Sequence, residues 1–269
     1  MKVAAIQMRS GVDIDANMAA ADALIREAAA KGAKFIATPE MTHILQRSPK
    51  RLFAVLQPEE NNAALEQFAA LSKELAVDLL IGSMAIKTSE TRAVNRSYLF
   101  GKSGKITARY DKVHLFDVTL SRQETWRESN VYDRGDKAVL GQIDGAVLGL
   151  SICYDLRFGK MYRRYAQMGA HILTVPAAFT VPTGKAHWEP LLRARAIEGG
   201  SFVIAPAQGG LHEDGRTTWG HSLIIDPWGQ IIAQSDDDEI GIIYADLDMG
   251  AVEEARRKIP AWSQNSDFT

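Results

Sequence analysis

Apolar segments of strand length alternate with amphipathic segments of helical length along most of this chain, and this alternation limits the fold to a few architectures. Residues 3–8 and 34–38 resemble buried strands, and residues 13–31 between them repeat apolar side chains at helical spacing. A helix repeats its apolar face about every 3.6 residues, whereas a fully buried strand is a short continuous apolar run. Further strands are expected at 77–81, 146–152, 171–175, 202–205 and 240–245, and further helices at 64–75, 161–168 and 188–198. The pattern predicts an α/β protein.

Two expected hairpins interrupt the alternation. Residues 97–100 and 106–110 flank a Gly-Lys-Ser-Gly turn, and residues 223–226 and 230–233 flank Pro-Trp-Gly. Hairpins pair strands antiparallel, so the sheets are predicted to be mixed, with helices on their outer faces. The sequence contains neither an internal repeat nor a low-complexity linker, so residues 1–269 are predicted to form a single domain.

Composition and charge exclude several function classes. Lysine and arginine number 31 against 33 aspartates and glutamates, and the net charge of −2 argues against nucleic acid as a partner. No apolar run reaches the roughly 18 residues of a membrane span. Six scattered histidines and the single cysteine, Cys153, predict neither a metal site nor a disulfide. Residues 1–8 are typical of a strand rather than a signal peptide, so a reducing, cytoplasmic location is expected.

Three polar side chains stand at the ends of expected strands, namely Glu40, Lys112 and Cys153. The motifs of a serine-hydrolase elbow, a zincin and a phosphate-binding loop are absent from the sequence. Ligands of α/β proteins bind near the carboxyl ends of strands, where these three side chains would converge. Taken singly, a lone cysteine is usually a small buried hydrophobe, and a glutamate or lysine beside a strand is usually solvated. Only their combination indicates a base, a cation and a nucleophile.

The sequences around these residues resemble the carbon–nitrogen hydrolase (nitrilase) superfamily, over nearly the whole chain. The resemblance rests on the segments 38–40 (Thr-Pro-Glu), 110–117, 153–158 (Cys-Tyr-Asp-Leu-Arg-Phe), 184–189, 193–198 and 220–222. It implies a four-layer α-β-β-α sandwich and a catalytic triad of Glu40, Lys112 and Cys153, without a metal or organic cofactor. The family's second glutamate falls on Glu128. It lies within residues 119–136, a polar, aperiodic segment expected to be a long functional loop.

Amide hydrolysis suits these residue types. A thiol has a pKa of about 8.5 and needs activation at neutral pH, so Glu40 is expected to take the proton of Cys153 as a general base. The thiol would then form a thioester with the acyl group. Lys112 and the backbone N–H of Tyr154 are expected to stabilise the oxyanion. Water activated by Glu40 would cleave the thioester, with Glu128 orienting Lys112 or this water.

The stretch 176–229 resembles the branch of the superfamily that contains deaminated-glutathione amidases and omega-amidases. The closer resemblance predicts hydrolysis of deaminated glutathione to 2-oxoglutarate and cysteinylglycine, with omega-amidase action on 2-oxoglutaramate as the alternative. The residues expected to bind substrate are Tyr154, Phe179, Thr180 and His187. Both substrates carry a carboxylate beside a keto group, which calls for a cation or backbone donors in the pocket. The candidate cations are Arg157, Arg193, Arg195 and Arg216.

Two interpretations from other functional classes stay open at this point. The first is a catalytically inactive binding or assembly module on the same fold, against which the intact triad argues. The second is a nucleotide-binding α/β protein, although no glycine-rich phosphate loop follows an expected strand.

The resemblance also implies a homodimer, or a larger homo-oligomer, in which outer helices pack together. Tyrosine and arginine are enriched at interfaces, and the two expected helices at 161–168 and 188–198 contain Tyr162, Arg163, Arg164, Tyr165, Arg193 and Arg195. The alternative is that these tyrosines belong to the core and the arginines to solvent. Trp262 and Phe268 near the end of the sequence favour a partner surface, because large apolar side chains left exposed usually mark one.

Overall fold

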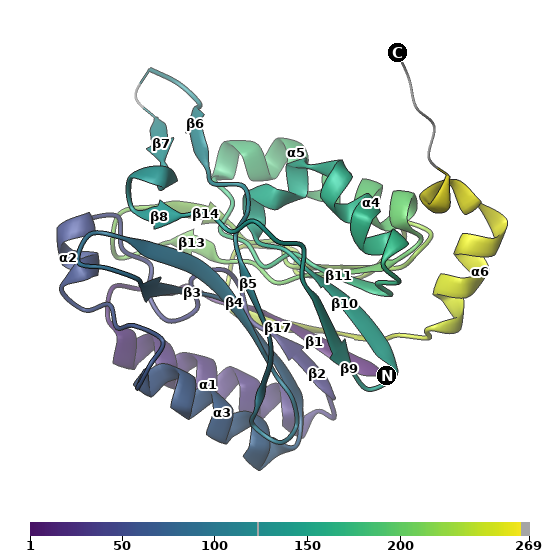
Figure 1. Ribbon diagram of the computed structural model, residues 1–269, viewed down its shortest axis with the longest axis horizontal. Helices are drawn as coiled ribbons and strands as arrows, with labels where there is room; N and C mark the ends of the chain where they lie inside the picture. Colours follow the sequence, from purple (N-terminus) through teal and green to yellow (C-terminus); the bar gives the residue numbers. More distant parts are fainter. Residues whose placement is uncertain (123, 265–269) are drawn as a thin grey trace.

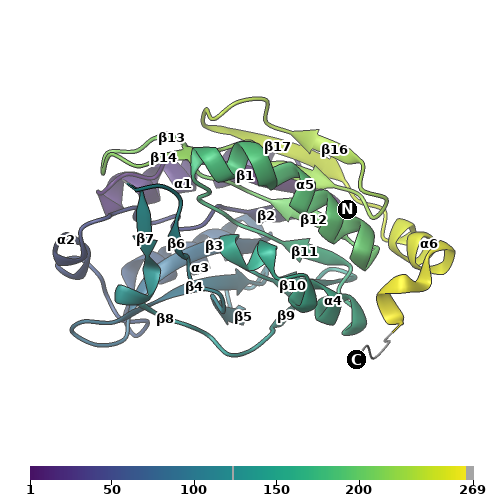
Figure 2. The same ribbon diagram turned by 90° about the horizontal axis from the view of Figure 1, so that it is seen from above.

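The computed structural model describes residues 1–122 and 124–264, and two mixed β-sheets lie face to face in it between two layers of helices (Figures 1 and 2). The first sheet has the strand order β17-β1-β2-β3-β4-β5, with β8 pairing with β4. Strands β1, β2 and β3 are parallel neighbours, whereas β17, β4 and β5 run antiparallel to the strands beside them. The strands are β1 (Lys2–Gln7), β2 (Phe35–Ala37), β3 (Asp78–Lys87), β4 (Ala93–Phe100), β5 (Ile106–Asp111), β8 (Tyr132–Asp133) and β17 (Gly241–Asp246).

The second sheet has the strand order β16-β15-β12-β11-β10-β9. Strands β10, β11 and β12 are parallel, and the two expected hairpins are present as β4 with β5 in the first sheet and β15 with β16 in the second. The strands are β9 (Leu140–Ile143), β10 (Ala146–Leu150), β11 (Ile172–Thr174), β12 (Phe202–Ala205), β15 (Leu223–Ile225) and β16 (Ile231–Gln234). The prediction of mixed sheets is therefore confirmed.

Helices cover the outer face of each sheet, α1 and α3 on the first and α4 and α5 on the second (Figure 1). The Asp13 side chain caps α1 by accepting a hydrogen bond from the N–H of Ala16, and Asn62 caps α3 by accepting one from the N–H of Leu65. A cap of this kind typically contributes about 1 kcal/mol. The helices are α1 (Ile14–Ala30), α2 (Pro49–Phe53), α3 (Ala63–Leu75), α4 (Gly159–Gln167), α5 (Val181–Gly199) and α6 (Gly250–Lys258).

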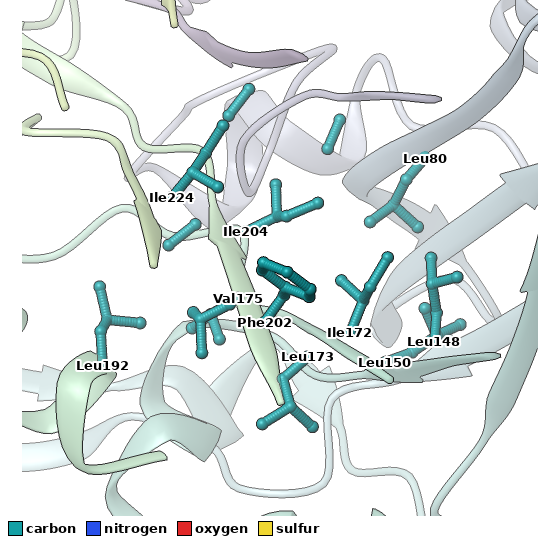
Figure 3. Close-up of a cluster of buried hydrophobic side chains, with 14 of the residues drawn as sticks. Leu80, Leu148, Leu150, Ile172, Leu173, Val175, Leu192, Phe202, Ile204 and Ile224 are labelled. Carbon is teal, nitrogen blue, oxygen red and sulfur yellow. The ribbon is translucent and has the colours of Figure 1, made fainter. Parts of the chain in front are cut away.

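Two buried apolar clusters lie between the layers and hold them together. Leu80 of β3 belongs to the same cluster as Leu148 of β10 and Ile172 of β11, so the inner faces of the two sheets share one core (Figure 3). Ile36 of β2 instead joins Phe68 of α3 in a second cluster, on the outer face of the first sheet. Successive side chains of a strand point to opposite faces, which lets one sheet serve both clusters. The predicted four-layer α-β-β-α sandwich is confirmed.

Some elements differ from the sequence prediction. The segment 119–136, expected to be an aperiodic loop, contains strand β7 (Thr125–Arg127), a 3-10 turn η1 (Glu128–Asn130) and β8. Strand β7 pairs antiparallel with β6 (Asp117–Thr119). These short strands are largely exposed, so their sequence shows no apolar alternation. Helix α6 was also not predicted, because its buried face consists of Val252 and Ala255 alone.

Other short elements were missed as well, namely α2, β9, β13 (Gly209–Leu211) and β14 (Thr217–Trp219). Each spans too few residues to establish a period. Within residues 1–122 and 124–264, no helix is both long and apolar enough to cross a membrane.

The stability of the fold is expected to decrease on acidification because of His43. This side chain is fully buried, and burial lowers its pKa from 6.5 to about 4. The unfolded chain binds a proton that the folded chain excludes, so the free energy of unfolding falls as the pH drops from 6.5 to 4, by about 3 kcal/mol. Urea denaturation of the wild type and of His43→Gln between these pH values measures the difference. Parallel pH profiles for the two proteins would contradict the prediction.

Candidate active site

Cys153 starts a 3-10 turn, η2 (Cys153–Arg157), shortly after strand β10 ends. Its backbone has a φ of 52°, in the left-handed region, which costs a non-glycine residue about 1–2 kcal/mol. The segment that follows β11 helps to hold this conformation, because the Cys153 N–H donates to the carbonyl of Pro176 at 2.9 Å. Strained backbone of this kind persists where the surroundings fix it, often at functional sites. Here the strained turn places the thiol in the wall of a cavity.

Glu40 lies in the loop after β2, and donors enclose its carboxylate. Oε1 accepts hydrogen bonds from Nζ of Lys112 at 2.8 Å and Nδ2 of Asn95 at 2.9 Å, and Oε2 accepts one from the N–H of Ala178 at 2.9 Å. The Cys153 thiol lies close enough to the same carboxylate for each group to shift the pKa of the other. Burial alone would raise the pKa of Glu40, but the charge and hydrogen bond of Lys112 outweigh it and hold the pKa below 4.5. Glu40 is therefore ionised at neutral pH.

Lys112 follows β5 and lies between two carboxylates. Its Nζ is 2.8 Å from Oε1 of Glu40 and 3.1 and 3.0 Å from the two carboxylate oxygens of Glu128. The side chain is only 2% exposed. Burial lowers the pKa of Lys112, but the charges of Glu128 and Glu40 more than compensate and raise it well above 10.5. The N–H of Phe116 also donates to Glu128 at 2.7 Å. Lys112 is thus a permanent, fixed cation.

The Cys153 thiol keeps its proton in the resting protein. Burial raises the pKa of the thiol, the charge of Glu40 raises it further, and Lys112 only partly opposes them, so the pKa lies well above 9.0. Glu40 is the neighbouring ionised base that can accept the proton as the sulfur attacks a carbonyl. Lys112 stands close to where negative charge would then develop. The first N–H groups of a helix have no intrahelical acceptor, which leaves that of Tyr154 in η2 able to assist.

Asn95 is a site residue that sequence reasoning missed. It lies on β4, where its Nδ2 donates to Oε1 of Glu40 at 2.9 Å and to Oε1 of Glu128 at 3.2 Å. The backbone carbonyl of Asn95 accepts a hydrogen bond from the backbone N–H of Lys112 at 2.9 Å. One amide thus orients both carboxylates toward the lysine. The only signal available was an asparagine within a strand, which is informative only once burial is known.

Asp155 is a second residue to which the sequence assigned no role. It is fully buried, and its carboxylate accepts hydrogen bonds from the N–H of Ile152 at 2.9 Å, the N–H of His114 at 2.9 Å and the hydroxyl of Tyr110 at 2.7 Å. These contacts connect the turn that contains Cys153 to Tyr110 and His114, the residues that flank Lys112 in the sequence. An aspartate three residues after Ile152 is a signal for local capping, and the sequence analysis did not use it.

The buried lysine, its two glutamate partners and the thiol line a cavity of about 410 Å³, within the range of roughly 300–1,000 Å³ found for small-molecule sites. The lining includes the four residues predicted to be catalytic, Glu40, Lys112, Glu128 and Cys153. It also includes three residues predicted to bind substrate, Tyr154, Phe179 and Thr180. His187 lies outside this lining, exposed on α5, with its Nδ1 3.3 Å from Nη1 of Arg157.

The segment between β6 and β8 builds one wall of the cavity. Thr125, Trp126 and Arg127 of β7 line it, as do Val131 and Tyr132. In Figure 1 the β6–β7 hairpin projects beyond the two sheets, near β8. The segment that lacks periodicity in the sequence thus both carries the second glutamate and shapes the pocket. In the described part of the chain, no three His, Cys, Asp or Glu side chains are placed to hold a metal ion.

The four arginines proposed to bind a substrate carboxylate have different surroundings in the structure. Arg193 and Arg195, on α5, donate from Nε to backbone carbonyls at 2.9 and 3.0 Å. Arg157 is not itself a lining residue; it contacts His187 and lies over the rings of Tyr154 and Phe179. Arg216 is the one of the four that belongs to the described lining.

Comparison with known proteins agrees with this geometry. The sequence pattern of the family described as Carbon-nitrogen hydrolase matches residues 2–257. The chain belongs to the carbon-nitrogen hydrolase family. This carbon-nitrogen hydrolase is 38% identical over 263 residues to the deaminated glutathione amidase of Synechocystis, with 96% of this chain and 95% of that protein covered. It is 32% identical over 265 residues to the omega-amidase NIT2 of Homo sapiens, with 98% and 94% covered.

Solved structures share the fold of this carbon-nitrogen hydrolase. The C. elegans NitFhit protein superposes with a TM-score of 0.90 at 31% identity, covering 98% of this chain. The chain spans 64% of the length of NitFhit. Saccharomyces cerevisiae Nit3, a member of the nitrilase superfamily, superposes with a TM-score of 0.87 at 27% identity, and the match covers 97% of this chain and 94% of Nit3. The predicted family resemblance is confirmed.

Proposed function

We propose that this carbon-nitrogen hydrolase is an amidase in which Cys153 is the nucleophile, Glu40 the general base and Lys112 the oxyanion partner. The observation that carries the proposal is a buried lysine held between Glu40 and Glu128, in the cavity that also contains the thiol. Burying such charges costs several kcal/mol for each ion before their attraction compensates. Perturbed titratable groups gathered in one cavity are typical of active sites.

The proposed reaction has two halves. In the first, Sγ of Cys153 attacks the amide carbonyl carbon while Glu40 accepts the thiol proton, and the carbonyl electron pair moves to oxygen beside Lys112 and the N–H of Tyr154. Collapse of this intermediate expels the amine, which takes the proton from Glu40, and leaves a thioester. In the second, water attacks the thioester as Glu40 accepts its proton. Collapse then releases the carboxylic acid, and the proton returns to sulfur. Glu128 keeps Lys112 oriented throughout.

The proposed substrate is deaminated glutathione, with 2-oxoglutarate and cysteinylglycine as products. The support is the 38% identity to the Synechocystis protein of that name over nearly the full length of both chains. Proteins of the same name from Bos taurus and Mus musculus are each 35% identical. Omega-amidase action on 2-oxoglutaramate is the second candidate, because the human omega-amidase is 32% identical. Both reactions would place a 2-oxoglutaryl group on Cys153 and differ in the amine released.

A comparison of the two amides with direct product detection tests the proposal. Release of cysteinylglycine from deaminated glutathione should exceed release of ammonia from 2-oxoglutaramate by about tenfold or more in kcat/KM, a ratio that pocket contacts readily supply. The reverse ratio would identify an omega-amidase. Hydrolysis of neither amide, by protein whose Cys153 still reacts with iodoacetamide, would reject both substrates.

We also propose that residues 1–269 form a single domain and that the enzyme acts in the cytoplasm. The family match over residues 2–257 and the core shared by both sheets support one domain. The proposed nucleophile is the single cysteine of the sequence, and oxidation would inactivate it. Reducing compartments keep such thiols free.

The structure changes the basis of the predicted homodimer. Tyr162 and Tyr165 are 1% and 0% exposed and belong to the core, so their assignment to an interface was wrong. The guanidinium carbon of Arg256 lies 4.9 Å from the ring centroid of Trp262. Phe268 lies outside the described residues. An apolar surface is exposed elsewhere, at the C-terminal end of α5, where Ile197, Trp228 and Ile259 line a shallow hollow.

A homodimer through this hollow is the proposed assembly. Ile197, Trp228 and Ile259 are each more than half exposed, at 52%, 57% and 53%, and clustered exposed apolar side chains usually mark a contact surface. Light scattering at micromolar concentration should give about twice 29.5 kDa. Trp228→Lys should shift the mass toward the monomer, and Leu211→Lys, at another exposed apolar site, should not. A monomeric wild type would contradict the proposal.

A further inference from the structure

The peptide unit between Glu40 and Met41 is held from both sides by side chains. Its carbonyl oxygen accepts a hydrogen bond from Nε2 of Gln208 at 3.0 Å, and its N–H donates one to Oγ of Ser83 at 2.9 Å. Ser83 and Gln208 are both fully buried. Ser83 lies on β3 of the first sheet, and Gln208 follows β12 of the second. Side chains from both sheets therefore fix the backbone next to the proposed base.

The same peptide unit precedes a strained residue. The φ of Met41 is 56°, in the left-handed region, which a non-glycine residue adopts only at an energetic cost. Rotating the peptide unit would let Met41 return to a negative φ, so the two hydrogen bonds oppose a change that the backbone favours. Strained conformations persist where their surroundings fix them, often at functional sites.

A β-bulge in β3 presents Ser83 to this loop. The pairing register with β4 shifts between Ile81 and Met84, so residues 82 and 83 lie opposite a single residue of β4. Bulges disrupt the ladder locally and are frequent beside active sites. Here the backbone groups of Ser83 bond to the loop instead: the N–H donates to the carbonyl of Pro39 at 3.3 Å, and the carbonyl accepts the N–H of Thr42 at 2.9 Å.

Contacts with Ser10 fix the orientation of the Gln208 amide. Its Oε1 accepts the N–H of Ser10 at 3.0 Å, and its Nε2 donates to the hydroxyl of Ser10 at 2.7 Å. A backbone carbonyl can only accept a hydrogen bond, so Nε2 is the atom that faces Glu40. Gln208 thereby connects the loop that carries the proposed base to the segment that follows β1.

We propose that Ser83 and Gln208 are positioning residues, which keep Glu40 directed toward Lys112 and Cys153 by fixing the peptide unit that follows it. The inference rests on the proposed amidase function. Neither residue belongs to the described lining of the cavity, so neither is expected to touch the substrate. Misplacing a reacting group by about 1 Å can reduce turnover by about 10²-fold. The contribution of both residues is therefore expected in kcat rather than in KM.

Ser83→Ala and Gln208→Met each remove one of the two hydrogen bonds to the peptide unit. With deaminated glutathione as substrate, each is expected to lower kcat by roughly 10- to 100-fold and to leave KM within about twofold. The matched control is Ser72→Ala on α3, at the outer face of the first sheet (Figure 1). Its buried hydroxyl donates to the carbonyls of Val77 and Gly101. The control should lose comparable stability but keep the wild-type kcat.

A pH profile separates positioning from a general loss of packing. The charge and hydrogen bond of Lys112 hold the pKa of Glu40 below 4.5. A displaced carboxylate loses part of this stabilisation, so the acid limb of kcat/KM should move to higher pH in Ser83→Ala and Gln208→Met. The limb should not move in Ser72→Ala.

Met41→Gly provides a rescue experiment. Glycine adopts positive φ about as readily as negative φ, so the peptide unit needs less support when residue 41 is glycine. Adding Ser83→Ala to Met41→Gly should therefore lower kcat by less than about threefold relative to Met41→Gly alone. An equal loss in both backgrounds would show that the hydroxyl does not act through the backbone of Met41, and would overturn the inference.

Alkylation of Cys153 by iodoacetamide separates this inference from the proposed function, because the thiol must lose its proton in that reaction as well. At neutral pH the rate should fall by roughly tenfold in Ser83→Ala and Gln208→Met and stay unchanged in Ser72→Ala. If this pattern is found but the wild type cleaves neither proposed amide, the amidase proposal fails and the positioning role stands. Wild-type rates in Ser83→Ala or in Gln208→Met, or an equal loss in Ser72→Ala, would overturn the inference. Either variant decides the outcome if the other does not fold.

Discussion

Replacing Cys153 with alanine is expected to abolish amide hydrolysis while leaving the fold intact. The chain contains one cysteine, so no other thiol can form the thioester. Removing the nucleophile from a set of groups that act as a unit costs on the order of 10⁴-fold or more in turnover. The substitution deletes one buried atom at a position that already has a strained backbone. The expected change in the free energy of unfolding is therefore within about 1.5 kcal/mol.

Product detection measures the loss of activity, and circular dichroism with thermal unfolding tests the fold. Mass spectrometry of the wild type, quenched during turnover, should show the acyl group on Cys153, and the alanine variant should show none. Cys153→Ser offers a second test, because its hydroxyl has nearly the same shape but is a far weaker nucleophile without a dedicated base of suitable strength. Near-normal turnover by either variant would exclude the covalent mechanism.

Lys112→Met is expected to reduce activity and stability together. The substitution keeps the bulk of the side chain but leaves the carboxylates of Glu40 and Glu128 buried without their shared cation. Removing one partner of a buried ion pair typically costs about 3–5 kcal/mol. The loss of an oxyanion partner is expected to lower kcat by roughly 10²-fold or more. Steady-state kinetics and urea denaturation at neutral pH measure the two effects.

Glu40→Gln is the matched control for this prediction. It should also reduce turnover by about 10²-fold or more, because the base is lost, but Lys112 keeps its contact with Glu128. Its stability loss should therefore be smaller than that of Lys112→Met. The double variant should lose much less activity than the product of the two single losses, since both groups serve the same step. Turnover by Lys112→Met within about tenfold of wild type would exclude the proposed role of the lysine.

Sequence reasoning located the proposed catalytic side chains because each one follows an expected strand within a distinctive local motif. The sequence pattern places Glu40, Lys112 and Cys153 at strand ends, and the structure brings all three to one cavity. Asn95 was missed because a polar residue inside a strand gives no sign of which face it occupies. Its role depends on contacts with residues 55 and 33 positions away in the chain, which no local pattern encodes.

Two assignments of helical residues did not agree with the structure, for the same physical reason. Spacing identifies which side chains share a face but does not say what covers that face. His187 follows Thr183 by one turn of α5, yet Thr183 lines the cavity and His187 is exposed beyond it. Tyr162 and Tyr165 were assigned to an interface, although the second sheet covers them. The layer that packs against a helix is set by the whole topology.

The carboxylate of Glu40 has a consequence for how the protein folds. Its three hydrogen-bond partners are 55, 72 and 138 residues away in the chain, and the most distant, Ala178, follows a strand of the second sheet. Contacts of such long sequence separation require large loops to close first and are slow to form. A chain with either sheet formed alone cannot enclose this carboxylate. We therefore expect catalytic activity to appear late in folding, when the two sheets pack together, and partly folded chains to be inactive.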